Sequence, residues 1–184
     1  NSATFFISGS CHRRENLMHE ARFKAIAEAL FKLSDEGFQI LWSIRPGTQT
    51  AIKEYELQAE LEKHSNILAV PDIPNYTDTM FLLSKARMIV TDSGSMQEEA
   101  AALHVPCVTA RFVTDRPESV EAGVNVLAPP KSASEILRAA YAVDEDNDEM
   151  RKKKNPYGDG NSSKLILDAI EKFEGKLIQW EHQK

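Results

Sequence analysis

The stretch MIVTDSGSMQEEAA, residues 88–101, decides the fold, because it passes from a strand into a helix through a turn with almost no side-chain bulk. Its first four residues are apolar or β-branched, as in a buried strand. Residues 92–95 are small or polar, and residues 97–99 open a helix-forming run. The stretch therefore predicts a strand, a glycine-containing turn and a helix in immediate succession.

The same alternation runs along most of the chain and indicates an α/β fold. Short runs rich in β-branched and aromatic residues predict strands at 4–8, 38–44, 66–70, 87–91, 106–110 and 125–128. Helical patterns occupy 17–33, 49–63, 77–84, 96–103, 132–143 and a last run from 162 to about 173. Strands alternating with helices favour a parallel sheet covered on both faces. We expect an open doubly wound sheet of about six strands, which is a Rossmann-like domain, since a closed eight-fold barrel needs more chain.

Composition limits the class of protein. The chain has 184 residues, 42% of them apolar, which suits one domain with a real core. The net charge of −6 argues against nucleic acid or an anionic membrane as a partner. No apolar run is long enough for a transmembrane helix, and no signal peptide is visible. We interpret Cys11 and Cys107 as reduced core residues of a cytoplasmic protein. Because the chain starts at Asn1 and enters an apolar run at once, we interpret it as an excised domain.

Ligands of open α/β sheets bind beyond the carboxyl ends of the strands, so the residues there are the candidates for a site. After the first strand, GSCHRREN, residues 9–16, predicts a glycine turn followed by His12, Arg13 and Arg14 at a helix start. This pattern fits an anion site, and it fits surface ion pairs equally well. After the second strand, Arg45 either reaches a ligand or is solvated.

The turn at residues 92–95 has two interpretations as well. Gly94 lets a ligand approach the backbone, the first helical N–H groups lack partners, and a diphosphate would fit there. Glu99, one turn after Ser95, could accept hydrogen bonds from the vicinal hydroxyls of a ribose. Alternatively, Asp92 or Ser93 caps the helix, and the two glutamates at 98 and 99 answer its dipole.

Three further segments carry weaker signals. Arg116, in the loop after the fifth strand, could clamp a phosphate. NPYGDGNSSK, residues 155–164, is a glycine-rich entry to a helix that fits either a ligand-facing loop or a plain cap. The charged run DEDNDEMRKKK, residues 144–154, indicates a solvated helix end or loop.

Together, four of these segments resemble the UDP-N-acetylglucosamine 2-epimerase family. HRREN (12–16), TDSGSMQEE (91–99), TDRPE (114–118) and NPYGDG (155–160) stand in that family's order and at about its spacing. The resemblance spans nearly the whole chain and covers the second of the family's two Rossmann-like domains, which is one half of the GT-B fold. It implies that residues 1–184 form a single UDP-binding domain and that the family's N-terminal domain is absent from this chain.

The resemblance also implies roles for individual residues. Ser93, with the backbone of Gly94 and Ser95, would bind the diphosphate of UDP, and Glu99 would hold the ribose hydroxyls.

Three further residues complete the implied site. Arg116 would contact the phosphates, Arg13 would support the same anion pocket, and His12 would be a catalytic residue beside the sugar. The implied reaction interconverts UDP-GlcNAc and UDP-ManNAc by loss and re-addition of UDP, with no cofactor and no metal. As isomerases of nucleotide-sugar metabolism, such enzymes serve polysaccharide biosynthesis, and this chain alone would be inactive.

Three positions depart from the family pattern. Ser95 stands where glycine is usual, Arg45 lies where the family has a histidine of an activator site, and Thr79 replaces a common aromatic while Tyr76 matches. These departures leave two alternatives open: a hydrolysing or glycosyltransferase-like relative, and a non-catalytic nucleotide-binding module. The implied partners are a UDP-sugar, the missing N-terminal domain and a second copy of the full-length protein.

Overall fold

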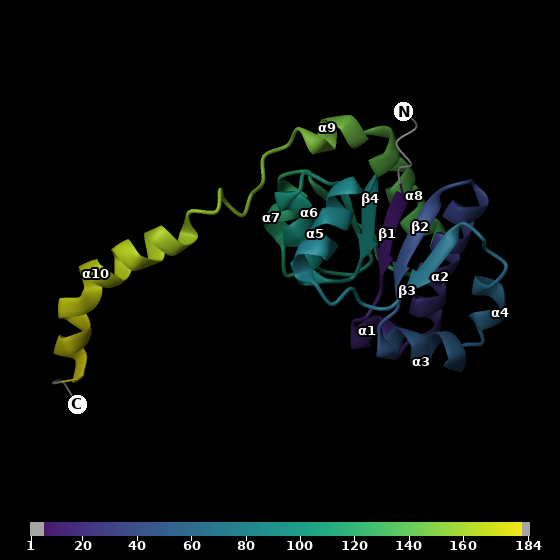
Figure 1. Ribbon diagram of the computed structural model, residues 1–184, viewed down its shortest axis with the longest axis horizontal. Coiled ribbons are helices and arrows are strands. Elements are labelled where there is room, and N and C mark those ends of the chain that lie inside the picture. Colours follow the sequence, from purple (N-terminus) through teal and green to yellow (C-terminus); the bar gives the residue numbers. More distant parts are fainter. Residues whose placement is uncertain (1–5, 182–184) are drawn as a thin grey trace.

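The computed structural model describes residues 6–181, with side chains up to residue 173. It contains one six-stranded parallel sheet, ordered β3-β2-β1-β4-β5-β6, with helices on both faces (Figure 1). Each predicted strand overlaps one observed strand, which confirms the open doubly wound fold. The strands are β1 (Phe6–Ser10), β2 (Gln39–Ser43), β3 (Ile67–Val70), β4 (Met88–Thr91), β5 (Cys107–Thr109) and β6 (Asn125–Leu127).

The helices fill the connections between strands and the carboxyl-terminal part of the chain. They are α1 (Arg14–Leu17), α2 (Glu20–Asp35), α3 (Pro46–Glu54), α4 (Gln58–Leu61), α5 (Tyr76–Lys85), α6 (Gly94–Ala102), α7 (Pro117–Glu121), α8 (Ala133–Glu145), α9 (Asn147–Arg151) and α10 (Ser162–Glu181). Helices α2 and α8 pack together, whereas α5, α6 and α7 follow one another against the part of the sheet formed by β4 to β6.

The strand order reverses between β1 and β4, and this reversal defines where a ligand can enter. Strands β1 to β3 run outward on one side, and β4 to β6 run outward on the other. At the carboxyl end of the pair, Ser10 lies opposite Thr91, and their hydroxyl oxygens are 2.6 Å apart. The loops that follow these two strands therefore leave the sheet side by side, at its topological switch point.

Alternating strand residues bury themselves in two separate cores. Ile7, Trp42 and Val90 belong to the larger core with α2 and α8. Ile89 and Cys107 belong to the smaller core on the other face. This period of two is what a strand buried on both faces requires. Both cysteines are free and buried, as predicted for reduced core residues.

The predicted glycine turn after the first strand is wrong in its position. Gly9 lies inside β1, which continues to Ser10. A β-carbon at Gly9 would lie 3.1 Å from Cδ1 of Leu30. The missing side chain therefore allows α2 to pack closely on the strand.

Two predicted helices differ from the observed ones. The predicted helix 17–33 begins only at Glu20, after the short helix α1. The predicted helix 49–63 is two helices, α3 and α4, separated at Glu56, whose φ is +58°. A left-handed residue cannot continue an α-helix, and Leu57 turns into the core just after it.

The charged run at 144–154 contains the predicted helix end, but it is only partly solvated. It contains the end of α8 and the helix α9, which buries Asn147 and Met150. Arg151 donates from Nη2 to the backbone oxygens of Ala86 and Arg87, at 2.7 and 3.0 Å. The run thus holds the chain against the residues just before β4 through Arg151.

The helix α7 was not predicted at all.

The last helix, α10, extends away from the rest of the described chain (Figure 1). Its exposed apolar side chains include Leu165, Ile166, Ile170 and Phe173. Within residues 6–181, no helix is both long enough and apolar enough to cross a membrane.

Candidate functional site

The start of α6 lies at the switch point and is capped by its own sequence. Ser93 is the N-cap residue, and its hydroxyl accepts a hydrogen bond from the backbone N–H of Met96 at 3.4 Å. The hydroxyls of Ser93 and Ser95 are 3.2 Å apart. Of the two predicted capping residues, Ser93 therefore caps the helix and Asp92 does not. Because neither Glu98 nor Glu99 lies in the first turn, the dipole interpretation of these acids is not supported.

Gly94 makes room for charged side chains from two other loops. A β-carbon there would lie 3.2 Å from Nη2 of Arg13 and 3.3 Å from Oδ1 of Asp115. The guanidinium of Arg13 pairs with Asp115 at 3.2 Å, so a cation and a carboxylate stand together over the helix start. The outward-pointing N–H groups of α6 and the guanidinium of Arg13 suit an anion, which would compete with Asp115 for that guanidinium.

A buried arginine, Arg111, holds Asp115 in position to pair with Arg13. Arg111 is 7% exposed and pairs with Glu15 at 3.0 Å and with Asp115 at 2.8 Å. Burial favours a higher pKa for Asp115. The hydrogen bond from Arg111, a backbone hydrogen bond and the charges of Arg111 and Arg13 outweigh burial and leave the pKa of Asp115 lowered. Asp115 therefore stays ionised and holds Arg13 in place.

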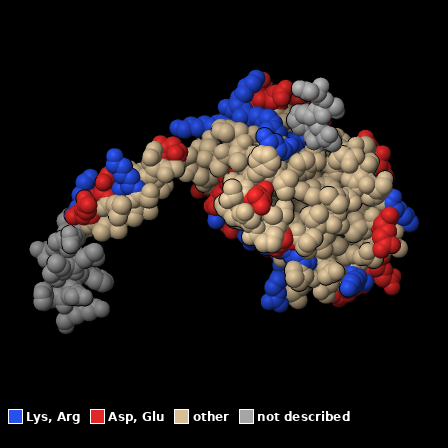
Figure 2. Space-filling view, in the orientation of Figure 1, with Lys and Arg blue, Asp and Glu red and all other residues tan. Residues whose placement is uncertain are grey.

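A cavity of about 280 Å³ lies beside the start of α6, between the sheet and α5. We call it the α6 cavity. Ser93, Ser95 and Glu99 line one side, and Tyr76 and Thr79 of α5 line another. The remaining lining residues come from β1, β2 and the end of β3, from the loops after β2 and β3, and from α5 and α6, namely Phe6, Ser8, Leu41, Ser43, Arg45, Val70, Pro71, Asp72, Ile73, Pro74, Leu82, Leu83 and Met96. Figure 2 shows that the face over α5 and β3 carries few charged side chains.

Glu99 is the carboxylate of the α6 cavity. Burial raises its pKa, and the neighbouring charge of Glu98 acts in the same direction. A hydrogen bond with Tyr76 and the charge of Arg45 oppose that shift, but the pKa of Glu99 remains raised. A half-buried carboxylate beside a tyrosine hydroxyl is a hydrogen-bond acceptor suited to hydroxyl groups.

Arg45 stands at the mouth of the α6 cavity. Its Nε lies 3.0 Å from Oδ2 of Asp72, and the Ser43 hydroxyl donates to Oδ1 of Asp72 at 2.9 Å. The three residues join the end of β2 to the loop before α5. Of the two interpretations of Arg45, the structure supports a residue that faces the site, although half of its side chain is solvated.

His12 lies on the neighbouring loop, outside the lining of the cavity. Its side chain is 23% exposed, and its Nδ1 is buried without a hydrogen-bond partner. Burial lowers the pKa of His12, and the charges of Arg45 and Arg13 lower it further, while Asp92 and Asp72 oppose them. The ring is therefore neutral near pH 7 and can exchange a proton.

Arg116 lies 3.8 Å from Asp115, the partner of Arg13, and like Arg13 and His12 it is outside the lining of the α6 cavity. Its guanidinium pairs with Glu98, and its Nη1 donates to the backbone oxygen of Asp115 at 2.8 Å. It does not line the α6 cavity. Contact with a phosphate would require its side chain to leave Glu98.

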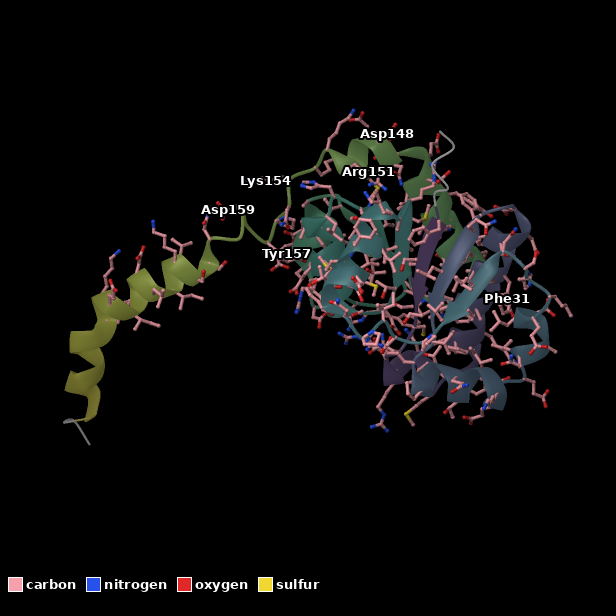
Figure 3. All side chains as sticks on the ribbon, in the orientation of Figure 1. Phe31, Asp148, Arg151, Lys154, Tyr157 and Asp159 are labelled. Atoms are coloured by element: carbon pink, nitrogen blue, oxygen red, sulfur yellow. The ribbon has the colours of Figure 1, made fainter. Side chains whose placement is uncertain are left out.

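The glycine-rich segment 155–160 connects α9 to α10, away from the α6 cavity. Asn155 donates to the backbone oxygen of Gly158 at 3.0 Å, and Gly158 and Gly160 have φ values of +99° and +88°. Figure 3 shows Tyr157 beside the domain near α7, and Asp159 farther out on the segment that enters α10. The segment is a left-handed turn sequence that only glycine forms readily.

The sequence did not reveal the polar residues that join these loops. Asp92 is completely buried and accepts hydrogen bonds from the backbone N–H groups of His12 and Arg13. Gln97 accepts from the hydroxyl of Thr114 at 2.6 Å and donates to the backbone oxygen of Ser93 at 3.0 Å. No periodic pattern marks such residues, because their partners lie in distant parts of the chain. No group of three or more potential metal ligands occurs among the residues that the structure describes.

Comparison with known proteins places these features in a family. The family model described as UDP-N-acetylglucosamine 2-epimerase matches residues 3–171. The UDP-N-acetylglucosamine 2-epimerase of Methanocaldococcus jannaschii is 36% identical over 157 residues, which are 85% of this chain and 42% of that protein. The chain thus spans about two fifths of the length of the curated relatives it matches.

Solved structures show the same likeness. A crystal structure of the Methanocaldococcus jannaschii enzyme in complex with UDP-GlcNAc and UDP matches with a TM-score of 0.82 and 33% identity, covering 92% of this chain and 46% of that one. The enzyme from Neisseria meningitidis bound to UDP-GlcNAc matches with a TM-score of 0.80 and 28% identity, covering 94% and 46%. Structural neighbours include GT-B epimerases and glycosyltransferases, which confirms the prediction of one half of a GT-B fold.

Proposed function

Because the chain belongs to the UDP-N-acetylglucosamine 2-epimerase family, we propose that it is the UDP-binding half of an enzyme that interconverts UDP-GlcNAc and UDP-ManNAc. Residues 1–184 would form one domain, and a second domain outside this chain would face the carboxyl edge of the sheet. The observation that carries the proposal is the α6 cavity at the switch point, because Ser93 and Ser95 of the helix start, Arg45 and the half-buried carboxylate of Glu99 share its lining.

The geometry supports a specific pose for UDP. The diphosphate would lie at the start of α6, against the N–H groups of residues 94 and 95 and the guanidinium of Arg13. The ribose would then reach Glu99, one helical turn along the same wall. The base would occupy the part of the cavity next to Tyr76 and the loop before α5. Arg116 would join the phosphates after leaving Glu98.

The proposed chemistry is loss of UDP across C1 and C2 of the sugar, giving a 2-acetamidoglucal, followed by re-addition of UDP with a proton on the other face. The departing diphosphate gains negative charge, which the α6 start and Arg13 would stabilise. His12 would act as a catalytic residue beside the sugar and the leaving phosphate. The carboxylates that act at C2 would come from the absent domain, so this chain alone would not turn over substrate.

The proposed partners follow from the same assignment. They are a UDP-sugar, the remainder of the longer protein, and a second copy of that protein. The exposed apolar side chains of α10 suit a contact with the remainder of the protein. The free, buried cysteines fit a reducing compartment, which supports a cytoplasmic location.

Thermal unfolding with different nucleotides tests the proposal directly. UDP at about 100 times its Kd is expected to stabilise the chain by about 2.7 kcal/mol, which for this length is a rise of about 5–10 °C in Tm. GDP at the same concentration controls for the diphosphate, and uridine controls for the base and ribose. A shift with GDP that equals or exceeds the shift with UDP would contradict the proposed nucleotide specificity.

The affinity for UDP is also expected to depend on pH through Glu99. The free protein holds the pKa of Glu99 above its ordinary value, chiefly through burial, and the proposed ribose contact needs the ionised form. Affinity is therefore full above that raised pKa and falls as the pH decreases through it.

The matched control is Glu99→Gln, which does not titrate. UDP itself titrates near pH 6 with both proteins. The affinity of the wild type divided by that of Glu99→Gln therefore isolates the contribution of Glu99. That ratio, measured by isothermal titration calorimetry between pH 8 and about pH 4.5, should decrease on acidification. A ratio independent of pH would exclude the proposed role.

A further inference from the structure

Asp92 is a fully buried carboxylate whose surroundings are unusual. It is 0% exposed, at the end of β4. A buried charge without a cationic partner is costly. Among the residues that the structure describes, the one basic side chain within 4.0 Å of it is that of His12, whose Nδ1 lies 3.6 Å from Oδ1.

Asp92 accepts hydrogen bonds from four neighbouring groups. The backbone N–H of His12 donates to Oδ1 at 3.0 Å, and the backbone N–H of Arg13 donates to Oδ2 at 3.0 Å. Asn16 donates from Nδ2 to Oδ2 at 3.0 Å, and the thiol of Cys11 does so at 3.3 Å. An asparagine at this position would turn an NH₂ group toward these donors, so size alone does not explain the carboxylate.

The unpartnered ring nitrogen of His12 supplies a second, independent observation. Nδ1 is buried and makes no hydrogen bond, yet the nearest carboxylate oxygen is Oδ1 of Asp92. The same oxygen already holds the backbone N–H of His12. Backbone and ring of one residue therefore meet a single carboxylate, and a small rotation of the ring would complete the hydrogen bond.

We propose that Asp92 is the positioning residue of His12: it holds the loop through the backbone and accepts a hydrogen bond from Nδ1–H, so that Nε2 is the nitrogen presented to the ligand. The inference rests on the proposed catalytic role of His12. An imidazole fixed in this way can hold a proton at Nε2 and exchange it with an oxygen of the ligand, while Nδ1–H stays bonded to Asp92. The ring then keeps one orientation in both protonation states.

Other charged groups near His12 also change the pKa of its ring. Burial, Arg45 of the loop after β2, and Arg13 of its own loop all lower the pKa of His12. Asp92 and, more weakly, Asp72 raise it. Without the charge of Asp92, only Asp72 would still raise the pKa of His12, while burial, Arg45 and Arg13 would all lower it.

Nuclear magnetic resonance of the ¹⁵N-labelled 184-residue chain, without nucleotide, tests the proposal. The signals of His12 are assigned by comparison with His12→Gln, since the chain has 5 histidines. The wild-type ring is expected in the Nδ1–H tautomer when neutral. Asp92→Asn is expected to lose this preference and to lower the titration midpoint of His12 by about 1 pH unit. A wild-type ring in the Nε2–H tautomer, or an Asp92→Asn protein with both properties unchanged, would overturn the inference.

A matched control separates positioning from general support of the loop. The hydroxyl of Thr48 donates to the backbone oxygen of Cys11 at 2.5 Å, and both groups are buried. Thr48→Val removes that bond from the same loop without touching the charge. It is expected to lower Tm while leaving the midpoint and tautomer of His12 unchanged, and an equal change in both variants would count against Asp92.

Two further points keep the test decisive. If Asp92→Asn does not fold, the wild-type tautomer still decides between the two outcomes. Because no nucleotide is present, a failure of UDP to bind would leave this result standing, and a wrong tautomer would leave the proposed UDP site standing.

Discussion

Replacing Glu99 with alanine is expected to weaken binding of UDP by about 1–3 kcal/mol, which is about a 5- to 150-fold increase in Kd. In the proposed pose, the carboxylate accepts hydrogen bonds from the ribose hydroxyls, and alanine leaves those hydroxyls facing an apolar, partly buried wall. Isothermal titration calorimetry of the chain with UDP measures the change.

Asp78→Ala is the matched control for Glu99→Ala. Asp78 lies on α5, beside the α6 cavity, but it is exposed and does not line the wall. It removes the same charge and should leave Kd nearly unchanged. Equal losses in the two variants would mean that only the net charge matters, and no loss at Glu99 would exclude the ribose contact.

Replacing Trp42 with alanine is expected to lower the free energy of unfolding by about 3–5 kcal/mol, the largest effect predicted for this chain. Trp42 is completely buried in β2, with its ring centroid 6.4 Å from that of Phe23 and 6.2 Å from that of Phe31. Alanine would leave a cavity between the sheet and α2, which the surrounding elements can fill only in part. Urea unfolding followed by circular dichroism gives the difference.

Trp42→Phe separates packing from hydrogen bonding. The indole Nε1 of Trp42 is buried without a partner, so phenylalanine removes an unsatisfied donor as well as some volume. The expected loss is well below that of the alanine variant. Similar losses for both variants would show that the indole, and not the filled volume, matters at this position.

The sheet could be predicted from the sequence because each strand carries its own signal. The runs ending at Thr91 and Thr109 are apolar and β-branched, and α2 buries an apolar stripe that includes Phe23, Ile26 and Leu30. Three of the four motifs, HRREN, TDSGSMQEE and TDRPE, follow the carboxyl ends of β1, β4 and β5, whereas NPYGDG lies between α9 and α10. Ser93, Ser95 and Glu99 share the wall of one cavity, because helical spacing sets which residues share a face.

The errors arose where distant contacts override local pattern. Gly9 resembles a turn residue, but the close approach of Leu30 keeps it inside the strand. Glu56 adopts a left-handed conformation that nothing in its own sequence announces. Arg116 pairs with Glu98, and this ion pair depends on how the loop after β5 returns to α6. Contacts of this kind join residues that are distant in the chain, and they leave no periodic pattern in a single sequence.

The long sequence separation between Asp92 and the loop that it holds has a consequence for the synthesis of the protein. This residue follows its backbone partner His12 by 80 positions in the chain. On a ribosome, which builds from the amino terminus, the His12 loop emerges before Asp92 and stays without its anchor while β2, β3 and α5 are synthesised. Nascent chains released before β4 should therefore contain a partial sheet and no ability to recognise nucleotide.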